Sequence, residues 1–337
     1  GRAMVKASAP GKCILFGEHA VVYGQPAVAC SINQRIIVEL EEETKFDSWR
    51  LDGAILNLSK HPHIRFLRDN LWPEGQNPPL KIRIRGTLPP ASGLGSSAAL
   101  SVALVAALQQ LRQEELNPGI AGSLSHQAEA FAQGGRASPI DTTTSALGGF
   151  IVLSDTIERS LNHIGERTLQ NQDDSTTWQL HSFESKIPED TYLVIGNTGI
   201  RGSTSKQVSK VAALLSEEPE RQVEIEAIGS IARKGIEALR TGNMELVGKA
   251  MTENHIVLRS LGVSSPELER LIKAAAPSSL GVKLTGSGGG GCMIALTKDP
   301  ERTVGAIEME GGRAFISPFN TPGVRIETLS SQDNSRQ

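Results

Sequence analysis

A glycine- and serine-rich segment from Pro89 to Ala99 is the part of the sequence best suited to hold a polyphosphate. It leads directly into an apolar run, Ala98 to Leu111, which predicts a helix. Free backbone N–H groups and the positive end of the helix dipole attract phosphate at such a start, and small residues let the backbone approach it. A loop capped by Ser96 or Ser97 without a ligand would have a similar composition, so the segment alone leaves both interpretations open.

The same segment also fits the dinucleotide fingerprint G-x-G-x-x-G/A, from Gly93 to Ala98. Its surroundings argue against a dehydrogenase, because the preceding strand is expected to end near Arg85, two prolines before the first glycine. After the helix, residues 112–118 do not form a second strand ending in an acid. No Gly-Lys-Ser/Thr closes the loop as in a Walker motif. We therefore predict a phosphate loop of another kind.

A second glycine cluster lies near the C-terminal end, between the expected strands Val282 to Thr285 and Cys292 to Thr297. Five of its six residues from Gly286 to Gly291 are glycine, which an ordinary long turn does not explain. We expect a loop whose backbone can close over a ligand. A protein-kinase glycine loop would lie near the N-terminus and would need His-Arg-Asp and Asp-Phe-Gly further on, and neither tripeptide occurs.

The third motif, from Ala9 to Gly24, places Lys12, Glu18 and His19 among glycines and apolar stretches. These side chains offer one cation and two hydrogen-bonding groups near a cleft. By spacing alone, a solvated lysine and a surface histidine are the stronger interpretation. The motif gains weight only in combination with the two glycine loops.

Two acids complete the set of candidate residues. Glu129 falls on an Ala-rich helix that is expected to end at Gly134, and Asp141 precedes three threonines at the start of a new segment. A helical glutamate usually faces solvent, and an aspartate in such a place is usually an N-cap. Spacing alone therefore favours structural roles for both acids.

The elements around these motifs predict two domains that each mix helices and strands, which is an α+β class. We place the domains at residues 4–186 and 187–330, followed by a polar tail at 331–337, because the polar stretch 154–189 resembles a surface excursion between them. Long helical patterns fill residues 205–261, where Ser264 and Glu267 then have capping-box spacing for the next helix. The predicted strands are Cys13 to Phe16, Ala27 to Ile32, Ile36 to Leu40, Leu80 to Arg85, Phe150 to Leu153, Tyr192 to Gly196, Ala314 to Ser317 and Val324 to Leu329, together with the two that flank the second glycine cluster.

Composition restricts the class of partner. The formal charge is −3 with acids and bases interspersed, which predicts neither a nucleic-acid face nor a membrane-binding segment. The most apolar run is too short to span a bilayer. Cys13, Cys30 and Cys292 lie far apart without a CxxC pair, which predicts buried thiols in a reducing cytoplasm rather than disulfides or zinc ligands. A small metabolite is the expected partner.

The three motifs, in this order along nearly the whole chain, resemble the GHMP kinases. The segment from Ala9 to Lys12 and the one from Phe16 to Gly24 are specifically similar to the mevalonate kinases of that superfamily, and Ala137 to Asp141 resembles the segment that bears their catalytic aspartate. Further similar pieces are Asn197-Thr198, Ser203-Thr204 and Leu261-Gly262-Val263. The resemblance implies an N-terminal ribosomal-S5-like domain 2 and a C-terminal ferredoxin-like domain, with the active site between them.

The resemblance also implies roles for individual residues. Asp141 would act on the substrate's primary hydroxyl as base or orienter, and Lys12 would stabilise the developing alkoxide and the transferred phosphoryl group. Ser97 and Glu129 would hold Mg²⁺. The implied ATP contacts are Ala91, Ser92, Gly93, Leu94, Gly95, Ser96 and Ser97, and the implied substrate contacts are Glu18, His19, Gly286 and Ser287.

The implied reaction is phosphorylation of (R)-mevalonate by ATP to 5-phosphomevalonate, in isoprenoid biosynthesis, and a homodimer is one assembly that the resemblance allows. The alternative is another GHMP kinase such as phosphomevalonate kinase, which needs extra basic residues; Arg201 and Lys206 are the nearby candidates. A non-catalytic nucleotide-binding regulator would need neither Lys12 nor Asp141.

Two features depart from the expected pattern of the resemblance. Ser287 stands where we expect alanine, which adds a hydroxyl near the substrate site. The stretch from Gln133 to Ala137 is one residue longer than the expected spacing between the metal glutamate and the aspartate. The longer spacing makes Glu129 a less secure assignment than Asp141, and it leaves His126 as a further candidate.

Overall fold

Two long antiparallel strands, β1 and β2, organise the first half of the computed structural model, which describes residues 4–329. They belong to a nine-stranded sheet with the order β4-β3-β5-β2-β6-β8-β7, to which β1 and β13 add by pairing with β2 and β1. The strands of this sheet are β1 (Met4–Phe16), β2 (Ala27–Glu42), β3 (Arg50–Leu51), β4 (Ala54–Ile55), β5 (Leu80–Gly86), β6 (Phe150–Ser154), β7 (Asn162–Asn171), β8 (Asp174–Phe183) and β13 (Arg325–Ile326).

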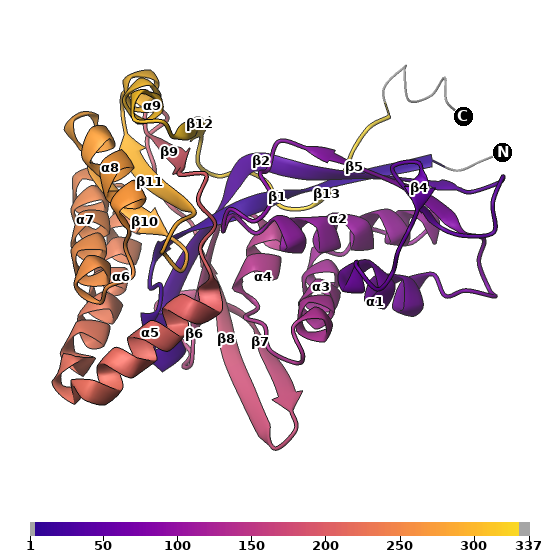
Figure 1. Cartoon of the computed structure of the whole chain (residues 1–337), viewed down its shortest axis with the longest axis horizontal. Helices are drawn as coiled ribbons and strands as arrows, with labels where there is room; N and C mark the ends of the chain where they lie inside the picture. The colour runs from indigo at the N-terminus through magenta and orange to yellow at the C-terminus, as the bar shows by residue number, and fades with distance from the viewer. Residues whose placement is uncertain (1–3, 330–337) are drawn as a thin grey trace.

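Four helices lie on one side of the long strands of this sheet, where α2 and α4 contact the strands and α1 and α3 pack on other helices (Figure 1). The central one, α2, is apolar around its whole circumference and is buried along most of its length against β1, β2, α3 and α4, as expected of a core helix. Its N-terminal end points toward the second half of the molecule (Figure 1). The helices are α1 (Pro62–Leu71), α2 (Ser96–Leu111), α3 (Pro118–Ala132) and α4 (Ile140–Leu147).

The second half contains a four-stranded antiparallel sheet with the order β10-β11-β9-β12. Along the chain, one strand is followed by helices, two strands, a helix and a last strand. The first and third of the four strands, β9 and β11, lie in the centre of the sheet, which is the ferredoxin-like arrangement. These elements are β9 (Tyr192–Asn197), α5 (Thr204–Glu217), α6 (Gln222–Thr241), α7 (Met244–Ser260), α8 (Pro266–Ala275), β10 (Gly281–Thr285), β11 (Cys292–Thr297), α9 (Pro300–Met309) and β12 (Arg313–Ser317). The α+β class expected from the sequence is confirmed.

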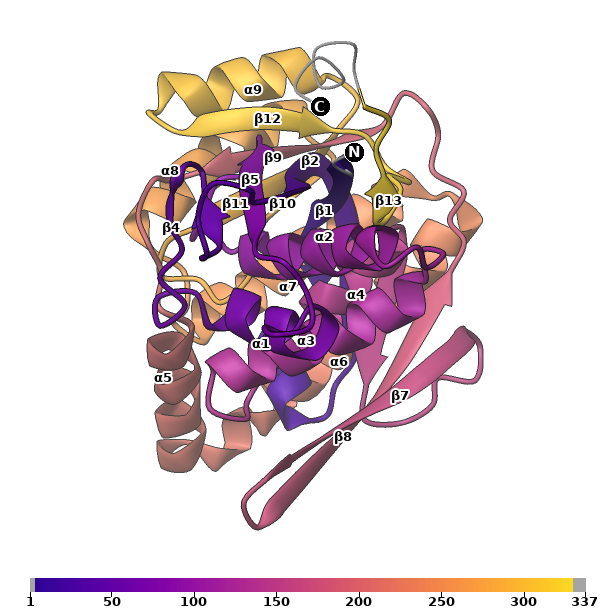
Figure 2. The same cartoon turned by 90° about the vertical axis from the view of Figure 1, so that its right-hand side faces the viewer.

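The polar stretch after residue 154 differs from its prediction. Instead of a surface excursion it is a long β-hairpin, in which β8 pairs with β6 and extends the first sheet. The hairpin projects from the body of the molecule (Figure 2). Backbone pairing stabilises this hairpin although most side chains on its outer strand are exposed, and a search for hydrophobic runs does not detect such a strand. The domain boundary at residues 186 and 187 stays a prediction.

Three local predictions need adjustment. The two strands expected between residues 27 and 40 are one continuous strand, β2. Ser265 rather than Ser264 caps α8, while Ser264 donates a hydrogen bond to Glu269. The last strand, β13, has two residues and pairs with β1 of the first sheet. The predicted polar tail at 331–337 lies outside the described residues, and no helix within the described chain is both long and apolar enough to cross a membrane.

The segment before β13 is tied to the first domain by side-chain contacts. Arg35 of β2 donates hydrogen bonds to the carbonyl oxygens of Pro322 (2.8 Å) and Gly323 (2.6 Å). Ser31 of the same strand donates to the carbonyl of Thr321 (2.8 Å). The chain therefore leaves the first domain after β8 and is anchored to it again before β13.

The end of β1 and the loop that follows contact the second domain directly. The hydroxyl of Thr285 in β10 accepts from the backbone N–H of Ile14 (2.8 Å), and the amide oxygen of Asn254 in α7 accepts from the N–H of Gly17 (3.3 Å). The motif carrying Lys12, Glu18 and His19 thus lies where the two domains meet.

Close packing of α7 on β10 depends on two facing glycines. A Cβ added at Gly248 would lie 2.3 Å from the carbonyl oxygen of Leu280, and one added at Gly281 would lie 2.1 Å from that of Gly248. Neither obstacle is a flexible side chain. The helix that carries Asn254 can therefore approach β10 only because both positions lack a side chain.

We expect Gly248→Ala to lower the free energy of unfolding by about 1–3 kcal/mol, because the methyl group overpacks a backbone contact. The matched control is Gly305→Ala, since Gly305 is an exposed position in α9 where an added Cβ meets nothing within 4 Å. Because alanine has a higher helix propensity than glycine, this control should raise the free energy of unfolding by up to about 1 kcal/mol. Urea unfolding of both variants measures the difference, and equal effects would contradict the packing argument.

Candidate active site

The loop before α2 leaves the start of that helix open. Gly95 is the N-cap residue with φ 74°, and no side chain caps the helix. The expected alternative in which Ser96 or Ser97 caps the helix is therefore wrong as regards the cap. Ala91 (φ 54°) and Gly93 (φ 82°) also have left-handed backbones, which turn the loop toward the helix start. The unpaired N–H groups of the first turn remain available to an anion.

Lys12 and Asp141 lie together beside this loop. The Lys12 Nζ donates to the carbonyl of Gly93 (2.9 Å) and is 3.4 Å from Asp141 Oδ1. Lys12 is buried, whereas the Asp141 side chain is 39% exposed. The absence of a side chain at Gly95 leaves room for Lys12 and Asp141 next to the loop. A Cβ added there would lie 3.3 Å from Lys12 Cγ. A cation and a carboxylate thus face one point near the helix start.

The position of Asp141 corrects a prediction made from spacing. Pro139 is the N-cap of α4, and Asp141 lies inside the first turn of the helix rather than at its cap. The helix dipole favours a negative charge in that turn. Its carboxylate makes no capping bond, so it is free to face the pocket.

Ser97 and Glu129 also lie together. The Ser97 hydroxyl donates to Glu129 Oε1 (2.9 Å), and Gln133 donates to the other carboxylate oxygen (3.0 Å). His63, at the start of α1, has its Nε2 3.6 Å from Glu129 Oε1. The stretch between the two acids turns at Gly134 and Gly135, which both have positive φ. Glu129 is buried in α3 next to the start of α2.

Glu18 and His19 face the second domain. The Nε2 of His19 is 2.8 Å from the carbonyl oxygen of Ser287, which can only accept, so this nitrogen carries the proton. Burial lowers the pKa of His19, while this hydrogen bond and the charge of Glu18 oppose the shift. The carboxylate of Glu18 contacts the ammonium of Lys283, and both groups are buried.

A cavity of about 380 Å³ joins these groups, a size typical of small-molecule sites. Its lining is drawn from both domains. It includes the predicted residues Lys12, Glu18, His19, Ala91, Gly93, Gly95, Ser96, Ser97, Asp141, Gly286 and Ser287, and also Ile14, Val21, Val22, Ser138, Ile140, Thr204 and Val208. The structure thus brings most of the predicted site residues together, with Glu129 behind Ser97.

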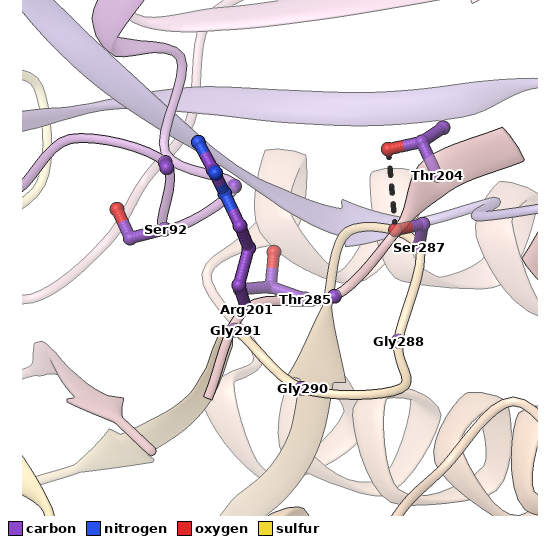
Figure 3. A pocket seen from close by; sticks show the side chains of 11 residues that line it. Ser92, Arg201, Thr204, Thr285, Ser287, Gly288, Gly290 and Gly291 are labelled. Atoms are coloured by element: carbon purple, nitrogen blue, oxygen red, sulfur yellow. Dashed lines mark hydrogen bonds between the residues drawn. The ribbon is translucent and has the colours of Figure 1, made fainter. Parts of the chain in front are cut away.

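A second pocket of about 240 Å³ lies between the two glycine loops (Figure 3). The loops approach closely, since a Cβ on Gly291 would lie 3.2 Å from the carbonyl oxygen of Ser92. Arg201 extends across this pocket from the segment before α5 (Figure 3). The Ser287 hydroxyl accepts from Thr204 (3.4 Å), which is the contact that alanine could not make.

His126 and Lys206 are not among the described residues that line either pocket. The Nε2 of His126 is hydrogen-bonded to the carbonyl of Ala137 (2.8 Å), and its ring packs edge-on against Trp178. It supports the turn before α4 instead of facing the cavity.

Comparison with known proteins agrees with this geometry. The family model for the GHMP kinases N terminal domain matches residues 58–149, and that for GHMP kinases C terminal matches residues 236–308. A protein of Pyrococcus furiosus named mevalonate kinase is 34% identical over 356 aligned positions, which cover 96% of this chain and 99% of that protein. The chain belongs to the mevalonate kinase family of the GHMP kinases.

Solved structures of GHMP kinases share the two-domain fold. The L. major mevalonate kinase in complex with R-mevalonate has a TM-score of 0.80 at 26% identity, covering 96% of this chain and 98% of that one. The Streptococcus pneumoniae phosphomevalonate kinase has a TM-score of 0.72 at 18% identity, covering 94% and 99%, and shows the fold alone. The GHMP kinase fold expected from the sequence is confirmed.

Two residues of this GHMP kinase site were missed by reasoning from the sequence. Lys283 is fully buried between Val282 and Leu284, and a lysine in so apolar a strand is a signal that a buried partner exists. His63 gave no such signal, because nothing in the sequence near it indicates that α1 packs beside Glu129.

We expect the stability of this GHMP kinase to fall as the pH drops below about 6.5, partly because buried neutral His19 must be protonated. Its folded-state pKa is lowered, so the unfolded chain binds the extra proton first, and each such group contributes at most about 1.4 kcal/mol per pH unit. Urea unfolding between pH 5.5 and 7.5 should give a shallower pH dependence for His19→Gln. The control His61→Gln, outside the cavity, should keep the wild-type dependence; equal slopes for all three proteins would contradict the assignment.

Proposed function

We propose that this protein transfers the γ-phosphoryl group of ATP to the primary hydroxyl of (R)-mevalonate, giving 5-phosphomevalonate. The observation that carries the proposal is the placement of Lys12 and Asp141, 3.4 Å apart, beside the uncapped start of α2. The helix start suits the phosphates, and the two charged side chains suit the hydroxyl that attacks them. Positioning and charge neutralisation supply most of the catalysis in phosphoryl transfer.

In this proposal each residue acts at a stated atom. A carboxylate oxygen of Asp141 accepts the hydrogen bond, and finally the proton, of the attacking hydroxyl. The ammonium of Lys12 stabilises the developing negative charge on that oxygen and on the transferred group. The left-handed conformations of Ala91, Gly93 and Gly95 shape the loop whose N–H groups bind the phosphates, while Gly286 and Ser287 border the cavity from the second domain.

The residues at the start of α2 fit a magnesium ion. Mg²⁺ prefers oxygen ligands and is typically held by one or two carboxylates together with substrate phosphates, and Ser97 and Glu129 supply such oxygens 2.9 Å apart. Across residues 4–329, no group of three or more His, Cys, Asp or Glu forms a metal site, which argues against an all-protein cage. When bound, the ion would neutralise charge on the β- and γ-phosphates.

The alternative substrate, phosphomevalonate, receives less support. Arg201 lies in the pocket between the glycine loops, not among the residues that line the cavity beside Asp141, and Lys206 lines neither pocket.

All three cysteines are free and buried, which fits a reducing compartment, so the proposal includes the cytoplasm as the location. Homodimer formation stays a prediction.

We expect purified wild-type protein to release ADP with mevalonate but not with phosphomevalonate, homoserine or galactose. Asp141→Asn should lower kcat by about 10²–10⁴-fold, and Lys12→Met by about 10³-fold or more. Asp174→Asn at the hairpin tip and the exposed Lys273→Met are matched controls and should keep wild-type turnover. A coupled ADP-release assay measures all five proteins; no turnover of mevalonate, or an active Asp141→Asn variant, would refute the proposal.

Glu129→Gln should raise the Mg²⁺ concentration needed for half-maximal activity by at least about tenfold, because a neutral amide is a weaker ligand than a carboxylate. The exposed Glu115→Gln, in the loop before α3, is the matched control. Magnesium titrations at saturating ATP give the value for each protein. An unchanged requirement in Glu129→Gln would remove Glu129 from the metal site.

A further inference from the structure

The ammonium of Lys283 is enclosed by three acceptors. It contacts Glu18, and it donates to the carbonyl oxygens of Leu284 (2.6 Å) and Ile14 (3.4 Å). Carboxylate and carbonyl oxygens only accept, so all three contacts use an N–H of the lysine, and only the protonated amine has three. The side chain is fully buried. Burial lowers the pKa of Lys283, and its contact with Glu18 opposes that shift, so the three acceptors favour the charged lysine at the junction of the two domains.

Glu18 uses only one of its carboxylate oxygens in this contact. Its Oε1 is buried and has no hydrogen-bond partner, although the residue lines the cavity. An unpaired buried acceptor is costly unless something fills it. Because an ionised carboxylate cannot donate, its missing partner must be a donor such as a hydroxyl, and the carboxylate of a substrate is excluded from this position.

A buried carboxylate such as that of Glu18 is costly in a folded protein unless an opposite charge is paired with it. The neighbouring His19 does not supply the charge, because its pKa is lowered and its Nε2 is already hydrogen-bonded to Ser287. Lys12, also in the cavity, is hydrogen-bonded to Gly93 and paired with Asp141. Lys283 is therefore the cation in contact with Glu18.

We propose that Lys283 is a positioning residue of the substrate site, which holds one carboxylate oxygen of Glu18 and thereby aims the other, free oxygen at a second, non-reacting hydroxyl of the substrate. The inference rests on the proposed function and deepens it. The reacting hydroxyl lies at Lys12 and Asp141, so the hydroxyl at Glu18 is the tertiary one of mevalonate. The site would thereby select hydroxy acids that carry two hydroxyl groups.

The test compares mevalonate with 5-hydroxy-3-methylpentanoate, which lacks the tertiary hydroxyl. Wild-type kcat/KM should be at least about 10²-fold higher for mevalonate, since a buried polar group left unpaired penalises the analogue. In Lys283→Met this ratio should fall to within about threefold of unity, with the KM for ATP changed by less than about twofold. Lys283→Arg should retain part of the ratio, and the exposed Lys298→Met should retain all of it.

A purely structural ion pair gives a different result. Lys283→Met would then lower activity toward both compounds equally and leave their ratio at the wild-type value, which would overturn the inference. If Lys283→Met does not fold, the double variant Glu18→Leu/Lys283→Met removes both charges and the acceptor oxygen, and it should also lose the ratio. A folded double variant that keeps it overturns the inference equally.

The proposed function can fail independently of this inference. A wild-type protein that phosphorylates neither compound refutes the proposed function. A wild-type protein that phosphorylates both equally well leaves the kinase activity standing and refutes the role of Glu18 and Lys283. Binding of mevalonate without ATP, measured by titration calorimetry, should weaken at least about tenfold in Lys283→Met if the inference is correct.

Discussion

The uncapped start of α2 governs the placement of the charged groups in the site. Because no side chain satisfies the first N–H groups, the helix end keeps its partial positive charge. The loop before the helix holds three residues in left-handed conformations. The same helix is apolar and is buried along most of its length, so packing against its neighbours fixes where its open start lies. Lys12, Ser97, Glu129 and Asp141 come from four different elements, and each of those elements packs on or belongs to α2.

The second constraint is that the substrate side of the cavity belongs to both domains. The end of β1 and the loop after it are hydrogen-bonded to β10, α7 and the second glycine loop. A change in the angle between the domains would therefore move Glu18 and His19 relative to Ser287. The proposed phosphate loop before α2 belongs to one domain, whereas the proposed substrate contacts Glu18, His19 and Ser287 come from both.

Sequence patterns predicted the parts of the candidate site that are formed by one short segment. They did not predict the contacts between residues far apart in the chain. The glycines around Gly93 and Gly286 could be found because backbone conformation restricts the residue type at each position. Asp141 was expected to cap a helix because spacing alone does not say where the helix begins. Lys283 pairs with Glu18, 265 positions away, and no local pattern connects them. The hairpin β7–β8 was missed because its exposed strands carry no hydrophobic period. In the second half, apolar runs located the strands, but the ferredoxin-like arrangement was expected only from the resemblance to the GHMP kinases.

The return of the chain end to the first sheet has a mechanical consequence. The ferredoxin-like domain is connected to its neighbour by two crossings of the chain, one after β8 and one before β13, and the second crossing is held to β2 through Arg35 and Ser31. A body tied at one point can swivel in any direction, but a body tied at two points turns mainly about the line that joins them. Any rotation of the ferredoxin-like domain should therefore be mainly about this line, which would keep the second glycine loop on one path relative to the first.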